Sequence, residues 1–274
     1  MKVLGYYSYI LAALSVLFHM LDRSNSIEEP SVWPIVGLSA VFSIVGKMLT
    51  ILADRRQQSE RDSRAAKLFS TILENESIAR YALYLRPFST TGRLIAPNPQ
   101  PRWLPILPGY FAHEKTLEFE TLLSNALAPD LPLVALGRPG EHIGAGRLAV
   151  ADDDWQAVFH RMIRDATWIV MIPSHEGETR WEIEQLVTQD YLGKTVFVMP
   201  PMLRSQKLDV AEYWKGVREG LQPFSIQLPK YTGSGQLFRL SRVGKFYRGR
   251  YLPKLKAHLV RDRFYGLTTR LPKR

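Results

Sequence analysis

The chain has 274 residues, a formal net charge of +10 and no cysteine. The absence of cysteine excludes disulfides, thiolate nucleophiles and zinc sites built on cysteine. Beyond an apolar N-terminal region, about 220 residues remain, which is enough for one α/β domain with a sizeable core.

The first 53 residues contain two apolar runs, Val3–Leu21 and Val32–Ala53, which are 19 and 22 residues long. Crossing a hydrocarbon core of roughly 30 Å takes about 20 helical residues. Lys47 is the one formally charged residue in the two runs. We therefore predict that residues 1–53 form a transmembrane hairpin in a lipid bilayer. A cleaved signal peptide over the first run and a hairpin buried in a soluble core are the alternatives.

The charges that flank the two runs predict their orientation. Lys2 precedes the first run, and Arg55 and Arg56 follow the second. Because Lys and Arg next to membrane spans stay in the cytoplasm, both termini should lie there. The predicted location is the inner (cytoplasmic) membrane, as a multi-pass protein.

Residues 54–77 are predicted to be a helical stalk that continues the second run. Apolar side chains recur there at helical spacing, between charges of both signs. These residues are Ala65, Leu68, Phe69, Ile72 and Leu73. The stripe is expected to pack on the following domain or on a second copy of the chain.

Residues 78–229 alternate short apolar strands with amphipathic helices. The expected strands are 80–85, 131–136, 168–172, 195–199 and 224–228. The expected helices are 114–126, 152–165, 179–191 and 210–221. This order predicts an α/β domain with a parallel sheet of about five strands and helices on both faces. Ligands of such sheets bind at the carboxyl ends of the strands.

Two strand-end segments carry candidate phosphate contacts. Arg86 follows the first expected strand, and the Gly-rich segment after 131–136 contains Arg138 and Arg147. Gly144 and Gly146 in that segment allow close approach of a phosphate to the backbone. The pattern is neither a Walker loop nor a Rossmann fingerprint. A simple turn at Arg86 and a long flexible loop are the alternatives.

A third strand-end segment carries candidate catalytic carboxylates. A polar turn at 174–178 leads into a helix that contains Glu182 and Glu184, together with Trp181 as a further expected contact of the bound nucleotide. Glu182, with Glu184 as the second choice, could bind a ribose or stabilise an oxocarbenium ion, as cleavage of a sugar bond requires. The alternative is a carboxylate that only complements the helix dipole. No spacing of ligands here is diagnostic of a metal, so none is expected.

The positive charge belongs to residues 230–274, which hold 13 Lys or Arg and one acidic residue. We read this segment as a basic C-terminal extension that faces anionic lipid. Nucleic acid is the less favoured partner. Aromatic residues interleaved with the charges would stack on bases in that case.

In this order, the pieces resemble the Toll/interleukin-1 receptor (TIR) domain family and its bacterial relatives over Ile78–Leu228. The resemblance rests on RYALYLRPF, LPLVALG, WIVMI and the helix that begins Thr179-Arg180-Trp181-Glu182-Ile183. It implies a flavodoxin-like fold and a catalytic Glu that cleaves the nicotinamide–ribose bond of NAD. NAD would then be a substrate, and no cofactor is implied.

The leading hypothesis is a membrane-anchored domain that recognises a nucleotide and cleaves NAD in stress or anti-phage signalling. Arg86, Arg138 and Arg147 would meet phosphates, Glu182 would meet the ribose, and the chain would act as a homo-oligomer. The first alternative is a non-catalytic membrane-tethered interaction module. The second is a membrane-tethered nucleic-acid binder that uses Lys230–Arg274.

Overall fold

The structure is a computed structural model of the whole chain. It describes residues 33–74, 80–87, 90, 93–97, 116–137, 143–151, 154–203 and 208–269, together with Leu11 and Leu14. The chain divides into two compact units. One holds residues 1–58 and 99–115, and the other holds residues 59–98 and 116–274.

The predicted second span and the predicted stalk form one continuous element. Helix α2 runs from Trp33 to Leu73, and the polar sequence that begins at Asp54 occupies its second half. Within the residues described, no helix is both long enough and apolar enough to cross a membrane. The predicted location as a multi-pass inner-membrane protein is therefore wrong, and the transmembrane hairpin is not found. Apart from Leu11 and Leu14, the run Val3–Leu21 lies outside the described residues.

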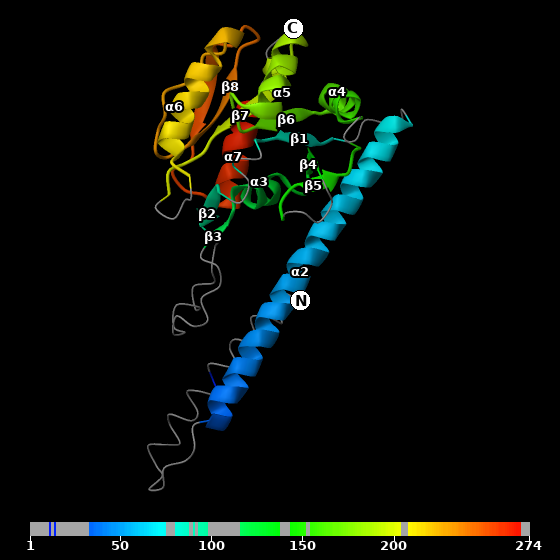
Figure 1. The fold of residues 1–274 in the computed structure, drawn as a ribbon, viewed down its shortest axis with the longest axis vertical. Helices are drawn as coiled ribbons and strands as arrows, with labels where there is room; N and C mark the ends of the chain where they lie inside the picture. The colour runs from blue at the N-terminus through cyan, green and yellow to red at the C-terminus, as the bar shows by residue number, and fades with distance from the viewer. Residues whose placement is uncertain are drawn as a thin grey trace. The chain divides into compact units, whose positions relative to one another are not determined.

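The second unit contains a seven-stranded sheet in the order β5-β4-β1-β6-β7-β8-β9 (Figure 1). Its strands are β1 (Ala82–Leu85), β4 (Leu133–Leu136), β5 (Gly146–Leu148), β6 (Trp168–Met171), β7 (Thr195–Met199), β8 (Gln236–Leu240) and β9 (Phe246–Tyr251). The first five in spatial order are parallel, β8 pairs antiparallel with β7, and β9 pairs antiparallel with β8. A separate ribbon pairs β2 (Ile95–Pro97) with β3 (Thr116–Glu118).

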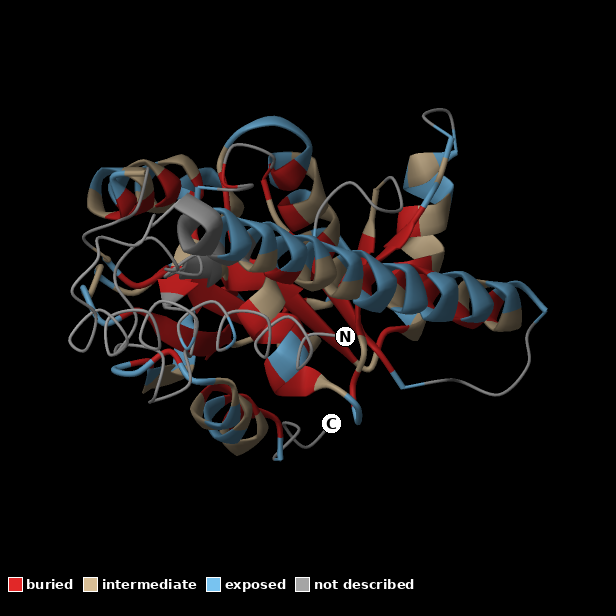
Figure 2. Cartoon of the chain, turned by 90° about the horizontal axis from the view of Figure 1, so that it is seen from below, coloured by how far each residue is buried: buried red, intermediate tan, exposed pale blue. Residues whose placement is uncertain are grey.

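Helices cover both faces of this sheet. The helices besides α2 are α3 (Phe119–Leu127), α4 (Trp155–Asp165), α5 (Gly177–Thr188), α6 (Val210–Gly220) and α7 (Ala257–Thr268), with short 3-10 turns η4 (Leu192–Lys194) and η5 (Gln222–Phe224). One core cluster joins the sheet to α4, α5, α6 and the C-terminal part of α2, and the other joins it to α3 and α7. Buried residues accordingly concentrate on the strands and on the inward sides of these helices (Figure 2).

The C-terminal half of α2 is fixed to the domain at two places. Arg161 of α4 donates hydrogen bonds from Nη2 to the carbonyl oxygens of Ile72 and Leu73, at 2.8 and 2.9 Å. Nearer its middle, Asp62 Oδ1 accepts the backbone N–H of Arg147 at 2.7 Å. Because the last carbonyls of a helix lack partners within the helix, Arg161 completes the end of α2 from outside.

The α/β class and the parallel strands β1, β4, β6 and β7 agree with the sequence prediction. The strand expected at 224–228 is replaced by η5 and irregular chain. Its place beside β7 is taken by β8, from the segment that we had read as a basic extension. Strand β5 lies in the segment that we had read as a Gly-rich loop.

Candidate functional site

The direction in which the chain adds strands to the sheet reverses between β1 and β6. From β1 the chain builds outward through β4 and β5, and then returns to place β6 on the other side of β1. Such a switch point is where open α/β sheets bind ligands, at the carboxyl ends of the strands. Arg86 follows β1 at this edge, and Ser174 and His175 follow β6. The loops after β1, β4, β5 and β7 are each described only in part.

Arg86 and Arg147 are brought together, but by a carboxylate of the protein itself. Arg86 Nε lies 2.6 Å from Glu120 Oε2, and Arg147 Nη2 donates to Glu120 Oε1 at 2.8 Å. All three side chains are buried, with exposures of 10%, 4% and 3% for Arg86, Arg147 and Glu120. The two cations that we expected to meet phosphates therefore neutralise Glu120 in the interior, on the sheet face covered by α3.

The space beside this triad is small. A pocket of about 10 Å³ is lined by Tyr84, Arg86, Thr90, Leu94, Glu118, Phe119, Glu120 and Ile172. That volume corresponds to roughly one water molecule. Burial, together with the charge of Glu120, raises the pKa of Tyr84, so its hydroxyl stays protonated at physiological pH. In this conformation the pocket is too small for a nucleotide.

Gly144 and Gly146 serve close packing within the protein. A Cβ on Gly144 would lie 2.5 Å from Glu120 Oε1, and a Cβ on Gly146 would lie 2.5 Å from the carbonyl oxygen of Arg61. Arg61 of α2 also donates to the Gly144 carbonyl at 2.7 Å. These glycines let α2 and Glu120 approach the start of β5, where we had expected a phosphate. Arg138, from the same segment, lies outside the described residues.

Glu182 is the candidate residue with the most perturbed environment. It lies on α5, the helix that begins after β6 at the switch point. Its side chain as a whole is half-buried, but Oε2 is enclosed and has no hydrogen-bond partner in the part of the chain that the structure describes. Burial raises the pKa of Glu182 to about 8, and the charge of Glu178 adds to this. Glu184, two residues on, is exposed.

Trp181 packs inside the protein. Its ring centroid lies 4.8 Å from that of Trp155, 5.1 Å from Phe159 and 5.6 Å from His160, all on α4. Trp181 thus packs α5 against α4. Its neighbour Glu182 therefore lies in a part of α5 that these ring contacts hold in place.

The turn after β6 contains a polar network that the sequence reading missed. Ser174 Oγ accepts the backbone N–H of Glu176 at 3.2 Å, and the Tyr213 hydroxyl donates to the Pro173 carbonyl at 2.6 Å. His175 lies against Gly216 and Gly220 of α6, where a Cβ on Gly216 would come within 3.2 Å of its Cε1. Two glycines four residues apart within an expected helix were the available signal for this packing.

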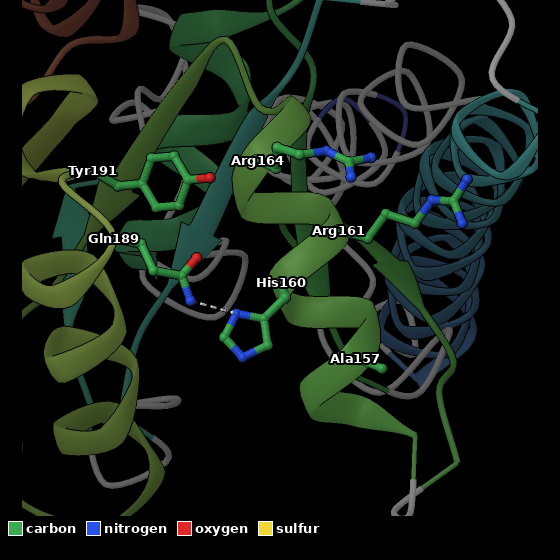
Figure 3. A pocket seen from close by; sticks show the side chains of 6 residues that line it. All are labelled: Ala157, His160, Arg161, Arg164, Gln189 and Tyr191. Carbon is green, nitrogen blue, oxygen red and sulfur yellow. Dashed lines mark hydrogen bonds between the residues drawn. The ribbon is translucent and has the colours of Figure 1, made fainter.

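A second pocket lies near the amino ends of β6 and β7, where α4 and α5 end (Figure 3). Its volume is about 450 Å³, and its lining residues are Ala157, His160, Arg161, Arg164, Gln189 and Tyr191. Its size is in the range of small-molecule sites. However, its polar groups bind protein: Arg161 holds the end of α2, Arg164 pairs with Asp165, and Gln189 bonds His160 at 2.9 Å. We therefore assign this pocket to helix packing.

The described part of the basic segment, residues 230–269, belongs to the sheet and its covering layer. Phe238 and Phe264 are buried, and Arg239 donates to the carbonyls of Leu267 and Gly193. The guanidinium of Arg239 also lies 4.9 Å from the Trp168 ring centroid. Three of its aromatic residues remain exposed, namely Phe246, Tyr247 and Tyr251.

The fold is that of an α/β domain with a mixed, mostly parallel seven-stranded sheet. Comparison with known proteins adds no name to this class: no family model, no curated protein and no solved structure matches the chain. The similarity to TIR domains therefore stays a hypothesis based on sequence motifs.

Proposed function

We propose that this α/β domain binds a nucleotide near the β1–β6 switch point and cleaves the nicotinamide–ribose bond of NAD with Glu182. The observation that carries the proposal is the enclosed Oε2 of Glu182, which has no hydrogen-bond partner among the described residues, together with the rise of the Glu182 pKa to about 8. Carboxyls perturbed in this way by burial concentrate at functional sites. Its place on the helix that follows the central strand β6 adds support.

In the proposed reaction, the bond between C1′ of the ribose and the pyridinium nitrogen breaks. The electron pair of that bond stays on nicotinamide, which leaves as a neutral base. Ionised Glu182 stabilises the oxocarbenium ion that remains, as carboxylates do in glycoside cleavage. Water then adds to C1′ and releases a proton, which gives ADP-ribose. Because Arg86 and Arg147 already form ion pairs with Glu120, we assign neither of them a phosphate contact.

The test is release of nicotinamide from NAD by the purified full-length chain, compared with Glu182→Gln and Glu184→Gln. The exposed Glu184 is a matched control on the same helix. Loss of a catalytic carboxylate should lower the rate by at least about 100-fold, whereas Glu184→Gln should match the wild type. Because the ionised form acts, the wild-type rate should rise with pH through about 8. Absence of nicotinamide release by the wild type, or equal rates for all three, would refute the reaction.

A second candidate function is a non-catalytic assembly module, which would not need the phosphate site that we expected at the Gly144–Arg147 segment. Arg61 and Asp62 of α2 bind this segment directly, so it is occupied by the protein's own helix. In this case the full-length chain would form a homo-oligomer without consuming NAD. Sedimentation together with the nicotinamide assay separates the two functions, because an assembly module should form an oligomer in both the wild type and Glu182→Gln while neither releases nicotinamide.

A further inference from the structure

Strand β9 forms an edge of the sheet with several exposed aromatic rings. Among the described residues it pairs with β8 alone. Phe246, Tyr247 and Tyr251 are 44%, 56% and 56% exposed, although aromatic side chains usually contribute large buried area. At a strand rise of about 3.3 Å per residue, these rings are spread along roughly 16 Å of the edge.

The same edge is strongly basic. From residue 220 to 261 the chain has nine Lys or Arg and no Asp or Glu. Arg242, Lys245 and Lys254 are exposed beside the rings. The carboxylate of Asp190, from outside this stretch, pairs with Arg242 at 3.2 Å, in a contact where both side chains are more than half exposed. We call the set Arg242, Lys245, Phe246, Tyr247, Tyr251 and Lys254 the aromatic–basic edge.

Protection of an open edge strand from aggregation explains only part of this composition. Lys and Arg on an edge do prevent pairing with other sheets. Exposed aromatic rings have the opposite effect, because they add apolar surface and favour β-pairing. Phe246 has internal roles, since its ring centroid lies 6.1 Å from that of the buried Phe238 and a Cβ on Gly249 would meet its Cζ at 3.1 Å. Tyr247 and Tyr251 make no ring contact and no side-chain hydrogen bond within the part of the chain that the structure describes, so internal packing does not explain why these positions are aromatic.

We propose that the aromatic–basic edge binds single-stranded nucleic acid. Proteins that bind single strands combine positive charge along the backbone path with aromatic side chains on which successive bases stack. The tyrosines of the edge supply the rings, and Arg242, Lys245 and Lys254 supply the charge. A duplex fits poorly, because its bases are already stacked on one another and present no free face to a tyrosine. This surface is separate from the Glu182 site, so either proposal can fail alone.

The test is fluorescence anisotropy of a labelled 15-nucleotide oligo(dT) with the purified full-length chain. The variants are Tyr247→Ala, Tyr251→Ala and Tyr247→Phe. The charge control is Lys215→Ala, which removes an exposed lysine of helix α6. Loss of one stacking ring should weaken binding about tenfold, and Tyr247→Phe should retain wild-type affinity because it keeps the ring. Lys215→Ala should change affinity less than twofold. The wild-type affinity should also fall steeply with salt.

Three results would overturn the proposal. The first is no binding of oligo(dT) at 100 µM protein. The second is binding that the tyrosine variants leave unchanged, which would indicate unspecific attraction of a basic surface to any polyanion. The third is equal or tighter binding of a 15-base-pair duplex or of vesicles that contain anionic lipid, which would assign the edge to another partner. Unchanged circular dichroism of each variant excludes misfolding as the cause of a loss.

Discussion

Two carboxylates on opposite faces of the sheet, each with an enclosed oxygen, have contrasting surroundings. Glu120 forms ion pairs with Arg86 and Arg147 and accepts the backbone N–H of Ala145, so two guanidinium groups offset its charge. Glu182 has an enclosed oxygen and no compensating cation among the described residues, and burial raises its pKa to about 8. Burial of a carboxylate is therefore not by itself evidence of catalysis. The informative difference is whether the protein has also provided its counter-charge.

The contrast separates stability from function. A compensated carboxylate ties three elements together, since Glu120 links α3 to the end of β1 and to β5. An uncompensated one costs stability when it ionises. Retaining it makes physical sense at a site that uses the carboxyl, so the proposed reaction uses Glu182 and not Glu120.

The largest expected effect is that of Glu120→Ala. Removing the carboxylate leaves two buried guanidinium groups without their counter-charge, which should lower the free energy of unfolding by about 3–5 kcal/mol. Urea denaturation measures this, with the exposed Glu212→Ala as the control. If the urea midpoint of Glu120→Ala matched that of the control, the ion pairs of Glu120 would not stabilise the fold, and the distinction between Glu120 and Glu182 would be wrong.

The next effect concerns Glu182→Gln and depends on pH. Between about pH 4.5 and 8 the native carboxyl holds a proton that the unfolded chain releases, so the unfolding free energy of the wild type should fall as pH rises through this window. The Gln variant does not titrate there. Its advantage over the wild type should grow from near zero at pH 4 to a few kcal/mol at pH 9, measured by thermal unfolding. Glu184→Gln should show no such trend, and a flat difference for Glu182→Gln would mean that Glu182 is ionised normally.

A smaller effect tests how α2 is attached to the sheet. Asp62→Ala removes the acceptor of the Arg147 backbone N–H and should cost about 1–3 kcal/mol, because that buried donor is left unpaired. Asp62→Asn keeps an acceptor oxygen and should lie close to the wild type. Hydrogen exchange at the Arg147 amide reports the same bond directly. Equal exchange in Asp62→Ala and Asp62→Asn would show that another group holds this amide.

The smallest effect compares two arginines of α4. Arg161 donates to the last carbonyls of α2, so Arg161→Ala should cost about 1–2 kcal/mol. Arg164 forms an exposed pair with Asp165, so Arg164→Ala should cost less than about 1 kcal/mol. Thermal unfolding of the two variants side by side is sufficient. A larger loss for Arg164→Ala would reverse our interpretation of the pocket that these two arginines line.

The sequence allowed the apolar parallel strands to be predicted, because runs such as 168–172 and 195–199 are buried on both faces. Strand β5 escaped prediction because it has three residues and an arginine at its centre. Its charge is tolerated only because Glu120, 27 residues earlier, lies opposite. Strands β8 and β9 were hidden by their basic residues, which dominate the composition of the segment.

The position of Glu182 could be predicted from the strand–turn–helix order, but its surroundings could not. Likewise, nothing in the sequence indicates that Arg86 and Arg147 share one partner, because the three residues are separated along the chain and meet only through the sheet register. The predicted phosphate site was a plausible assembly of residue types, and tertiary packing assigned most of its members to other neighbours.

The two edges of the sheet are not equivalent. At β5 the outward N–H of Arg147 is taken by Asp62 of α2, whereas β9 has no described strand on its outer side. A further strand could therefore be added at β9 but not at β5. Two copies that joined through β9 would form a continuous sheet ending in a covered β5 edge on each side, so that growth would stop at a closed pair and could not continue as a fibre.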